Sequence, residues 1–183
     1  MRMSAEYAGL VPQWLENNKS YVKNVFSNLP EPWHMSERRK LVTDKTSIVL
    51  TCLDPRCVPE NFFGPNMGGA VFRNAGGRAT DDVIRSITAL RELADLRTIV
   101  VVHHTDCGVM HITPQEIITT VAKSGAAAAS AAEMIDYKLF SFGELEQSIR
   151  NDVHVLKEAP TLKGMNVYGF KLDTFTGLVE PVE

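Results

Sequence analysis

The chain has 183 residues, of which 44% are hydrophobic and 22% are charged, and its formal net charge is −3. This length and composition predict one globular domain with a sizeable core, and a slightly acidic chain without a basic patch gives no indication of a nucleic-acid partner. No apolar stretch is long enough to span a membrane and the N-terminus lacks the apolar core of a signal peptide, so we expect a cytoplasmic protein without a membrane partner.

Residues 1–45 are predicted to form a helical N-terminal arm. The segment Glu6–Asn28 carries apolar residues such as Trp14 at roughly helical spacing. A proline-rich break follows at 30–32, and a shorter helical piece is expected near Ser36–Leu41. The apolar side of this arm needs another surface to cover it.

Residues 46–183 are predicted to form one α/β domain. Short β-branched or aromatic runs indicate strands at Thr46–Cys52, Ala70–Arg73, Thr98–His103 and Asn166–Phe170. Helical segments separate most of them, so we expect a central, mainly parallel sheet flanked by helices. The third run is β-branched at nearly every position, which is typical of a parallel strand covered on both faces.

Capping residues mark where the helices begin. Thr80 precedes two aspartates that suit the positive end of a helix dipole. Two more helices are expected after capping boxes at 113–116, where Pro114 takes the first helical position, and at 141–144. The alanine-rich stretch Gly125–Ala132 is compatible with either a helix or a loop.

Two short segments carry the residues that indicate chemistry. Cys52-Leu53-Asp54-Pro55-Arg56 closes the first predicted strand, and His104-Thr105-Asp106-Cys107-Gly108 follows the third. Because ligands bind at the carboxyl ends of parallel strands, neighbouring strands would bring Cys52, His104 and Cys107 to one point. Three cysteines are too few, and odd in number, for a disulfide scaffold, which favours reduced thiols that serve a metal or catalysis.

Two thiolates and one imidazole form a ligand set that suits zinc. Three protein ligands leave the fourth tetrahedral position open, as in catalytic rather than structural zinc sites. Zinc lowers the pKa of a bound water, so that hydroxide is available near neutral pH. We therefore expect one Zn²⁺ per subunit, held by Cys52, His104 and Cys107.

Asp54 and Arg56 follow Cys52 closely enough to act at the same site. Asp54 has two alternatives: it pairs with Arg56 and leaves zinc open, or it ligates zinc and closes the site. A guanidinium binds a carboxylate through two parallel hydrogen bonds, so Arg56 is able to hold Asp54 off the metal.

These motifs, each at or just after the end of a predicted strand, resemble those of the β-class carbonic anhydrases, above all their short bacterial and archaeal branch. The resemblance runs from about Ile48 to the C-terminus and includes the segments Arg73–Gly77, Thr80–Ser86 and His103–Gly108. It implies a zinc lyase that reversibly hydrates carbon dioxide to bicarbonate, with the three ligands named above and the Asp54–Arg56 dyad. It also implies a homodimer or a dimer of dimers, in which N-terminal helices wrap the partner.

The identity of the small linear triatomic substrate stays open. Relatives with the same zinc motif hydrolyse carbonyl sulfide or carbon disulfide. Many family members have a glutamine after the dyad, but residues 57–67 contain none, and Phe62, Phe63 and Met67 are expected to give an apolar pocket that would suit a sulfur-containing substrate. A non-catalytic zinc-binding interaction module is a third alternative, against which the intact dyad argues.

Residues beside the ligands have expected supporting roles. Backbone amides near Gly108 are expected to bind a substrate oxygen, and His111 is a candidate proton shuttle. Asp106 is expected to shape its loop, and Gly76-Gly77 to permit either a close approach of the backbone to the site or tight packing.

Two further residues are interpreted as structural. Cys57 is expected to pack as a small buried side chain. His103 lies next to His104 in the predicted strand, so its side chain should point to the opposite side and form structural hydrogen bonds.

Overall fold

The computed structural model describes residues 10–28, 46–64, 67 and 69–183. The chain divides into two units, Met1–Thr43 and Asp44–Glu183, and each is described by itself. In the first unit, helix α1 spans Leu10–Asn24 and the 3₁₀ helix η1 spans Phe26–Asn28, which agrees with the helix expected there. The helical piece expected near Ser36–Leu41 lies outside the described residues.

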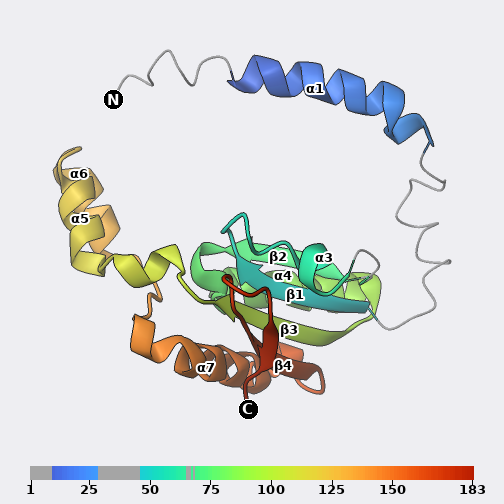
Figure 1. The fold of residues 1–183 in the computed structure, drawn as a ribbon. Helices are drawn as coiled ribbons and strands as arrows, with labels where there is room; N and C mark the ends of the chain where they lie inside the picture. Colours follow the sequence, from blue (N-terminus) through green and yellow to red (C-terminus); the bar gives the residue numbers. More distant parts are fainter. Residues whose placement is uncertain (1–9, 29–45, 65–66, 68) are drawn as a thin grey trace. The chain divides into compact units, whose positions relative to one another are not determined.

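The second unit is built on a five-stranded sheet in the order β2-β1-β3-β4-β5 (Figure 1). The strands are β1 Thr46–Cys52, β2 Ala70–Asn74, β3 Leu96–His104, β4 Asn166–Leu172 and β5 Val179–Pro181. The first four pair in parallel, and β5 pairs antiparallel with β4. The predicted α/β class and the four predicted strands are confirmed, whereas β5 was not expected from the sequence.

Helices α4 (Asp81–Ala94) and α7 (Leu145–Glu158) pack on one face of the sheet. Alternate strand residues meet the apolar stripes of these helices, and the resulting core includes Ile48, Leu50, Ile99, Val101, Val83, Ile87 and Leu156. Gly169 lets α7 approach β4 closely, because a Cβ at that position would lie 2.5 Å from a methyl carbon of Ile149. This layer of helices fixes the sheet and therefore the positions of its strand ends.

The opposite face of the sheet carries a second apolar cluster, which includes Val49, Val102 and Leu172. Phe62, at the end of the short helix α3 (Pro59–Phe62), packs against it. Beside this contact lies a groove of about 460 Å³, lined by Ser47, Val49, Phe63, Met67, Val100, Tyr168 and Phe170. The central strands are therefore apolar on both faces, as expected, but the long helices α4 and α7 cover one face.

Helices α5 (Pro114–Ala122) and α6 (Ala126–Glu133) pack against each other (Figure 1). Both expected capping boxes are formed, at Thr113 before α5 and at Ser141 before the 3₁₀ turn η4 (Phe142–Glu144) and α7. Thr80 occupies the N-cap of α4, although its side chain makes no capping hydrogen bond. Within the described residues, no helix combines the length and apolar character that crossing a membrane requires.

Candidate metal centre

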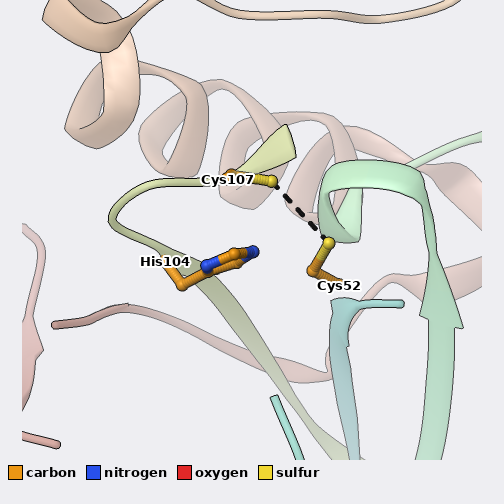
Figure 2. Close-up of side chains that lie close together, drawn as sticks. All are labelled: Cys52, His104 and Cys107. Atoms are coloured by element: carbon orange, nitrogen blue, oxygen red, sulfur yellow. Dashed lines mark hydrogen bonds between the residues drawn. The ribbon is translucent and has the colours of Figure 1, made fainter. Parts of the chain in front are cut away.

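Three side chains from two neighbouring strands meet at the carboxyl edge of the sheet (Figure 2). Cys52 is the last residue of β1 and His104 the last of β3, and these strands pair in parallel register. A tight turn at Asp106, which has a left-handed φ of 53°, then returns the chain so that Cys107 faces the same point. The structure thus brings together the three residues that the sequence singles out as zinc ligands.

The distances in this cluster fit a tetrahedral zinc ion. The Sγ atoms of Cys52 and Cys107 are 3.7 Å apart, and the ligand atoms of all three residues lie within 4.8 Å of one another. Two thiolates at a tetrahedral zinc, each with a Zn–S bond of about 2.3 Å, would be separated by about 3.8 Å. All three residues are buried, so water competes poorly for their ligand atoms.

The ring of His104 is oriented for metal binding. Its Nδ1 donates a hydrogen bond to the carbonyl oxygen of Thr105 at 2.9 Å, which makes Nε2 the ring nitrogen that a metal or a proton can bind. Among the described residues, this buried Nε2 has no hydrogen-bond partner. An orphaned buried nitrogen beside two thiols is costly unless a metal or proton occupies the space between them, so the donor set fits zinc.

The site attracts positive charge. A hydrogen bond from Cys107 lowers the pKa of Cys52, while the pKa of Cys107 is raised because its thiol keeps the shared proton. Burial alone would lower the pKa of His104, but the neighbouring sulfurs of Cys52 and Cys57 raise it to about 10. The thiolate character that draws a proton onto the imidazole would equally favour a bound cation.

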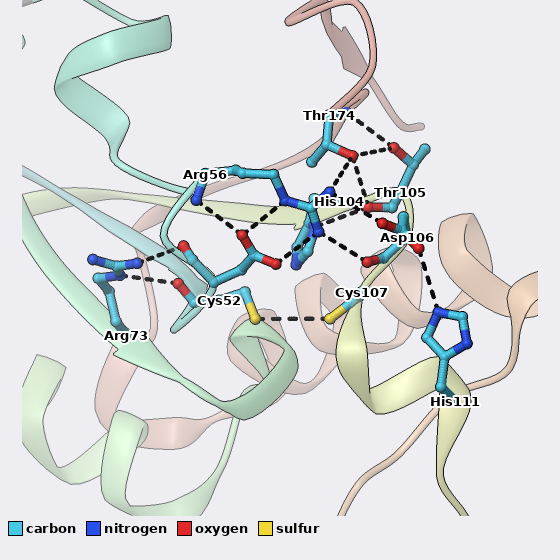
Figure 3. Close-up of polar contacts among 10 residues, drawn as sticks. Cys52, Arg56, Arg73, His104, Thr105, Asp106, Cys107, His111 and Thr174 are labelled. Atoms are coloured by element: carbon cyan, nitrogen blue, oxygen red, sulfur yellow. Dashed lines mark hydrogen bonds and ion pairs between the residues drawn. The ribbon is translucent and has the colours of Figure 1, made fainter. Parts of the chain in front are cut away.

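Arg56 lies beside this cluster (Figure 3) and forms the predicted pair with Asp54. The Oδ1 atom of Asp54 accepts hydrogen bonds from the backbone N–H and Nε of Arg56, both at 2.9 Å, and Oδ2 accepts from Nη2 at 2.7 Å. The Arg56 side chain holds the pKa of Asp54 at about 2, so this carboxylate is ionised at neutral pH. Of the two alternatives, the structure has Asp54 paired with Arg56.

Several contacts around the dyad were not expected from the sequence. Arg73 on β2 donates from Nε to the carbonyl oxygen of Cys52 at 2.9 Å and from Nη2 to that of Asp54 at 2.7 Å. Arg56 also contacts Asp106 and Thr174, which come from two other loops. These partners are far apart in the sequence, and no local spacing pattern relates them.

The glycines near the cluster have different roles. Gly77, in the 3₁₀ turn η2 (Ala75–Gly77), has a φ of +71°, and a Cβ there would lie 3.0 Å from the Thr51 carbonyl carbon. Of the two expectations for this glycine pair, the structure shows tight packing against the backbone of β1. Gly108 opens the 3₁₀ helix η3 (Gly108–His111) and is exposed, with open space where a side chain would be. A small molecule can therefore approach its backbone.

The remaining candidates are placed as follows. Cys57 is fully buried in the second core cluster, in keeping with its packing interpretation. His103 is also fully buried and bonds to Ser148 and to the carbonyl oxygen of Gly77, which agrees with structural hydrogen bonding. His111 is half exposed and its Nε2 lies 3.4 Å from a carboxylate oxygen of Asp106.

The predicted apolar pocket differs from expectation. Phe63 and Met67 line the groove on the open sheet face, whereas Phe62 packs into the second core cluster. Among the described residues that line this groove, none belongs to the Cys52–His104–Cys107 cluster. The physical reason is that Phe63, just after α3, packs edge-on against Phe170 of β4 on the sheet face that carries the groove, with ring centroids 6.0 Å apart.

Comparisons with known proteins point to one family. The model of the carbonic anhydrase family matches residues 47–178. The β-carbonic anhydrase 1 of Mycobacterium tuberculosis is 28% identical over 172 residues, covering 92% of this chain and 95% of that protein. The crystal structure of a carbonic anhydrase from Streptococcus mutans superposes with a TM-score of 0.76 at 29% identity over the whole of both chains. A carbon disulfide hydrolase of Acidianus sp. is 43% identical over 70 residues, covering 38% of this chain and 34% of that protein.

Proposed function

The chain belongs to the β-class carbonic anhydrase family, and from this premise we propose that it is a zinc-dependent carbonic anhydrase, which reversibly hydrates carbon dioxide to bicarbonate. The proposed ligands are Cys52, His104 and Cys107, with Asp54 and Arg56 as the catalytic dyad. The observation that carries the proposal is the buried cluster of two thiols and an orphaned imidazole nitrogen directly beside a carboxylate that Arg56 holds.

Zinc at this centre would supply a nucleophilic hydroxide near neutral pH. Asp54 is ionised, so it can only accept hydrogen bonds. It would orient the nucleophile by accepting a hydrogen bond from it. Arg56 fixes both oxygens of Asp54 and thereby limits the directions in which that carboxylate points. Backbone N–H groups near the exposed Gly108 would bind an oxygen of the substrate, and His111 would pass protons to solvent.

The test is a side-by-side assay of the zinc-loaded protein with carbon dioxide, carbonyl sulfide and carbon disulfide. Stopped-flow measurement with a pH indicator should record hydration of carbon dioxide that stops when zinc is chelated and returns when zinc is restored. A protein with one zinc per subunit that leaves carbon dioxide untouched would refute the proposal.

Carbon disulfide or carbonyl sulfide hydrolysis at the same centre is the second candidate. Relatives named carbon disulfide hydrolase favour it, at 34% identity over 88 residues and 43% identity over 70 residues. Turnover of a sulfur-containing substrate without turnover of carbon dioxide would establish this candidate. A zinc-loaded protein inactive on all three substrates would instead favour a non-catalytic zinc-binding module.

We also propose that the protein acts as a homodimer or a dimer of dimers in the cytoplasm, where its thiols would stay reduced. Two observations support the assembly. The sheet face that carries the Phe63–Phe170 groove is not covered by α4 or α7, and α1 exposes Trp14 and Leu15 at 61% and 60%. A partner's arm laid on this face would bury both apolar surfaces.

A further inference from the structure

The guanidinium of Arg56 is held on two sides, and Asp54 accounts for only one of them. On the far side, Nη1 donates to Oδ2 of Asp106 at 3.1 Å, and Nη2 donates to the backbone carbonyl oxygen of Asp106 at 3.0 Å (Figure 3). Arg56 therefore joins the loop that follows Cys52 to the loop between His104 and Cys107.

Asp106 presents its carboxylate from an unusual backbone conformation. Its φ of 53° is in the left-handed region, which aspartate, asparagine and glycine adopt more readily than other residues. Its other carboxylate oxygen, Oδ1, lies 3.4 Å from Nε2 of His111. The carboxylate therefore has one oxygen on the arginine and the other beside the histidine.

Thr174 adds a third anchor from the turn after β4. Its backbone N–H donates to Oγ1 of Thr105 at 2.9 Å, and its hydroxyl donates to the Thr105 carbonyl oxygen at 3.1 Å. The same hydroxyl oxygen accepts from Nη1 of Arg56 at 3.4 Å. That Thr105 carbonyl is also the acceptor for His104, so the anchor of Arg56 and the orientation of the imidazole share one atom.

We propose that Asp106, supported by Thr174, is a positioning residue that keeps Arg56 on Asp54 and so keeps Asp54 off the metal. The Arg56 side chain is 41% exposed, so solvent weakens its bidentate pair with Asp54, and the contacts with Asp106 and Thr174 restrict its rotamers further. When Arg56 leaves, Asp54 loses its partner and is free to become the fourth ligand two residues from Cys52. The inference rests on the proposed metal centre.

Cobalt in place of zinc makes the open position visible, because its visible absorption changes when azide binds to it. The variant Asp106→Gly removes the carboxylate without straining a left-handed position, and Asp106→Asn is the milder change. We expect Asp54 to occupy the metal in most Asp106→Gly molecules. Azide then binds only the fraction of molecules whose metal position is open, so its apparent affinity should fall about tenfold. The exposed Asp82→Ala, which removes a similar Asp–Arg pair on α4, should leave azide affinity unchanged.

A second substitution identifies the cause. In an Asp54→Asn background the competing carboxylate is absent, so adding Asp106→Gly should no longer weaken azide binding. Equal azide affinity in the cobalt-loaded wild type and Asp106→Gly overturns the inference and leaves the metal centre intact. The inference is also overturned if adding Asp106→Gly still weakens azide binding in the Asp54→Asn background. A wild-type protein that takes up no cobalt overturns the proposed metal centre, and the inference with it.

Discussion

At the scale of single residues, hydrogen bonds decide which groups are free to react. Nδ1 of His104 donates to the Thr105 carbonyl oxygen, and this bond leaves Nε2 as the nitrogen for the proposed zinc ion. Asp54 has both oxygens engaged by Arg56 yet keeps lone pairs for one more donor. Under the proposed function, these two residues have separate roles. Removal of His104 should lower the metal content, whereas removal of Asp54 should lower the rate.

Asp54→Asn should retain zinc but slow carbon dioxide hydration. An amide can turn its NH₂ group toward the nucleophile, so the hydrogen bond that orients it is lost, at a cost of about 10²-fold or more in kcat. Stopped-flow rates normalised to measured zinc content test this. An unchanged rate at full zinc occupancy would remove Asp54 from the mechanism.

At the scale of elements, a buried polar network ties β3, α7 and η2 together behind the metal centre. Asp152 on α7 accepts from Nε of Arg78 at 2.7 Å and lies 3.2 Å from Nε2 of His103. His103 in turn contacts the carbonyl oxygen of Gly77, whose turn packs against β1. The network therefore connects the helix layer to the glycine turn beside Cys52.

Asp152→Ala should destabilise the fold strongly. The substitution leaves the guanidinium of Arg78, which is 8% exposed, without its carboxylate partner, and breaking a buried pair in this way costs about 3–5 kcal/mol. Urea unfolding monitored by circular dichroism gives the difference. Asp82→Ala, which removes an exposed partner of Arg85, is the matched control and should cost no more than about 1 kcal/mol. Equal losses in the two variants would show that the network adds nothing.

The same carboxylate should make stability depend on pH. Burial would raise the pKa of Asp152, but the hydrogen bonds from His103 and Arg78 outweigh it and lower the pKa below the ordinary value. A lowered folded-state pKa stabilises the protein above the unfolded-state pKa of about 3.9, and this contribution is lost as the pH falls through the folded-state value.

Asp152→Asn removes this titration. The free energy of unfolding should therefore fall more steeply for the wild type than for the variant as the pH drops from about 5 to about 3. Urea unfolding at a series of pH values measures both curves. Parallel curves would contradict the lowered pKa.

Local patterns were sufficient to predict most elements and the three side chains that meet at the candidate metal centre, but they did not predict the long-range pairings. Cys52 and His104 could be placed because each ends a β-branched run, and the ends of neighbouring parallel strands lie together. The pairing of Arg56 with Asp106 spans 50 residues, and that of Arg78 with Asp152 spans 74. Such contacts depend on how loops and helices dock, which spacing alone does not encode.

At the scale of the whole molecule, both faces of the sheet are apolar, but α4 and α7 cover only one of them. Strand β5 was missed because its three residues, Val179–Pro181, carry too little pattern to predict. The groove lined by Phe63 and Met67 was expected at the substrate but lies on the open face of the sheet. Phe63 is therefore a candidate for the proposed assembly, whereas Phe62 packs against the apolar cluster on the same sheet face.

The protein should be at least a dimer in solution. Light scattering coupled to size-exclusion chromatography should give a mass of at least twice the 20.3 kDa of one chain at micromolar concentration. Trp14→Glu places a charge on the exposed apolar side of α1 and should weaken the assembly about tenfold or more, since burying one large aromatic often contributes over 2 kcal/mol to an interface. Ser20→Glu, an exposed polar position on the opposite side of the same helix, serves as the control. A monomeric wild type would contradict the proposed assembly.

The most direct test is the zinc content of two cysteine variants measured by mass spectrometry after purification. Wild type and Cys57→Ser should each carry one zinc per subunit, because Cys57 is buried but lies outside the ligand cluster. Cys107→Ser should lose it, with an affinity reduced more than about 100-fold, since even outer partners of a metal ligand contribute 10–100-fold. A Cys107→Ser protein that keeps a full zinc ion, or a wild type that binds none, would contradict the Cys52–His104–Cys107 centre.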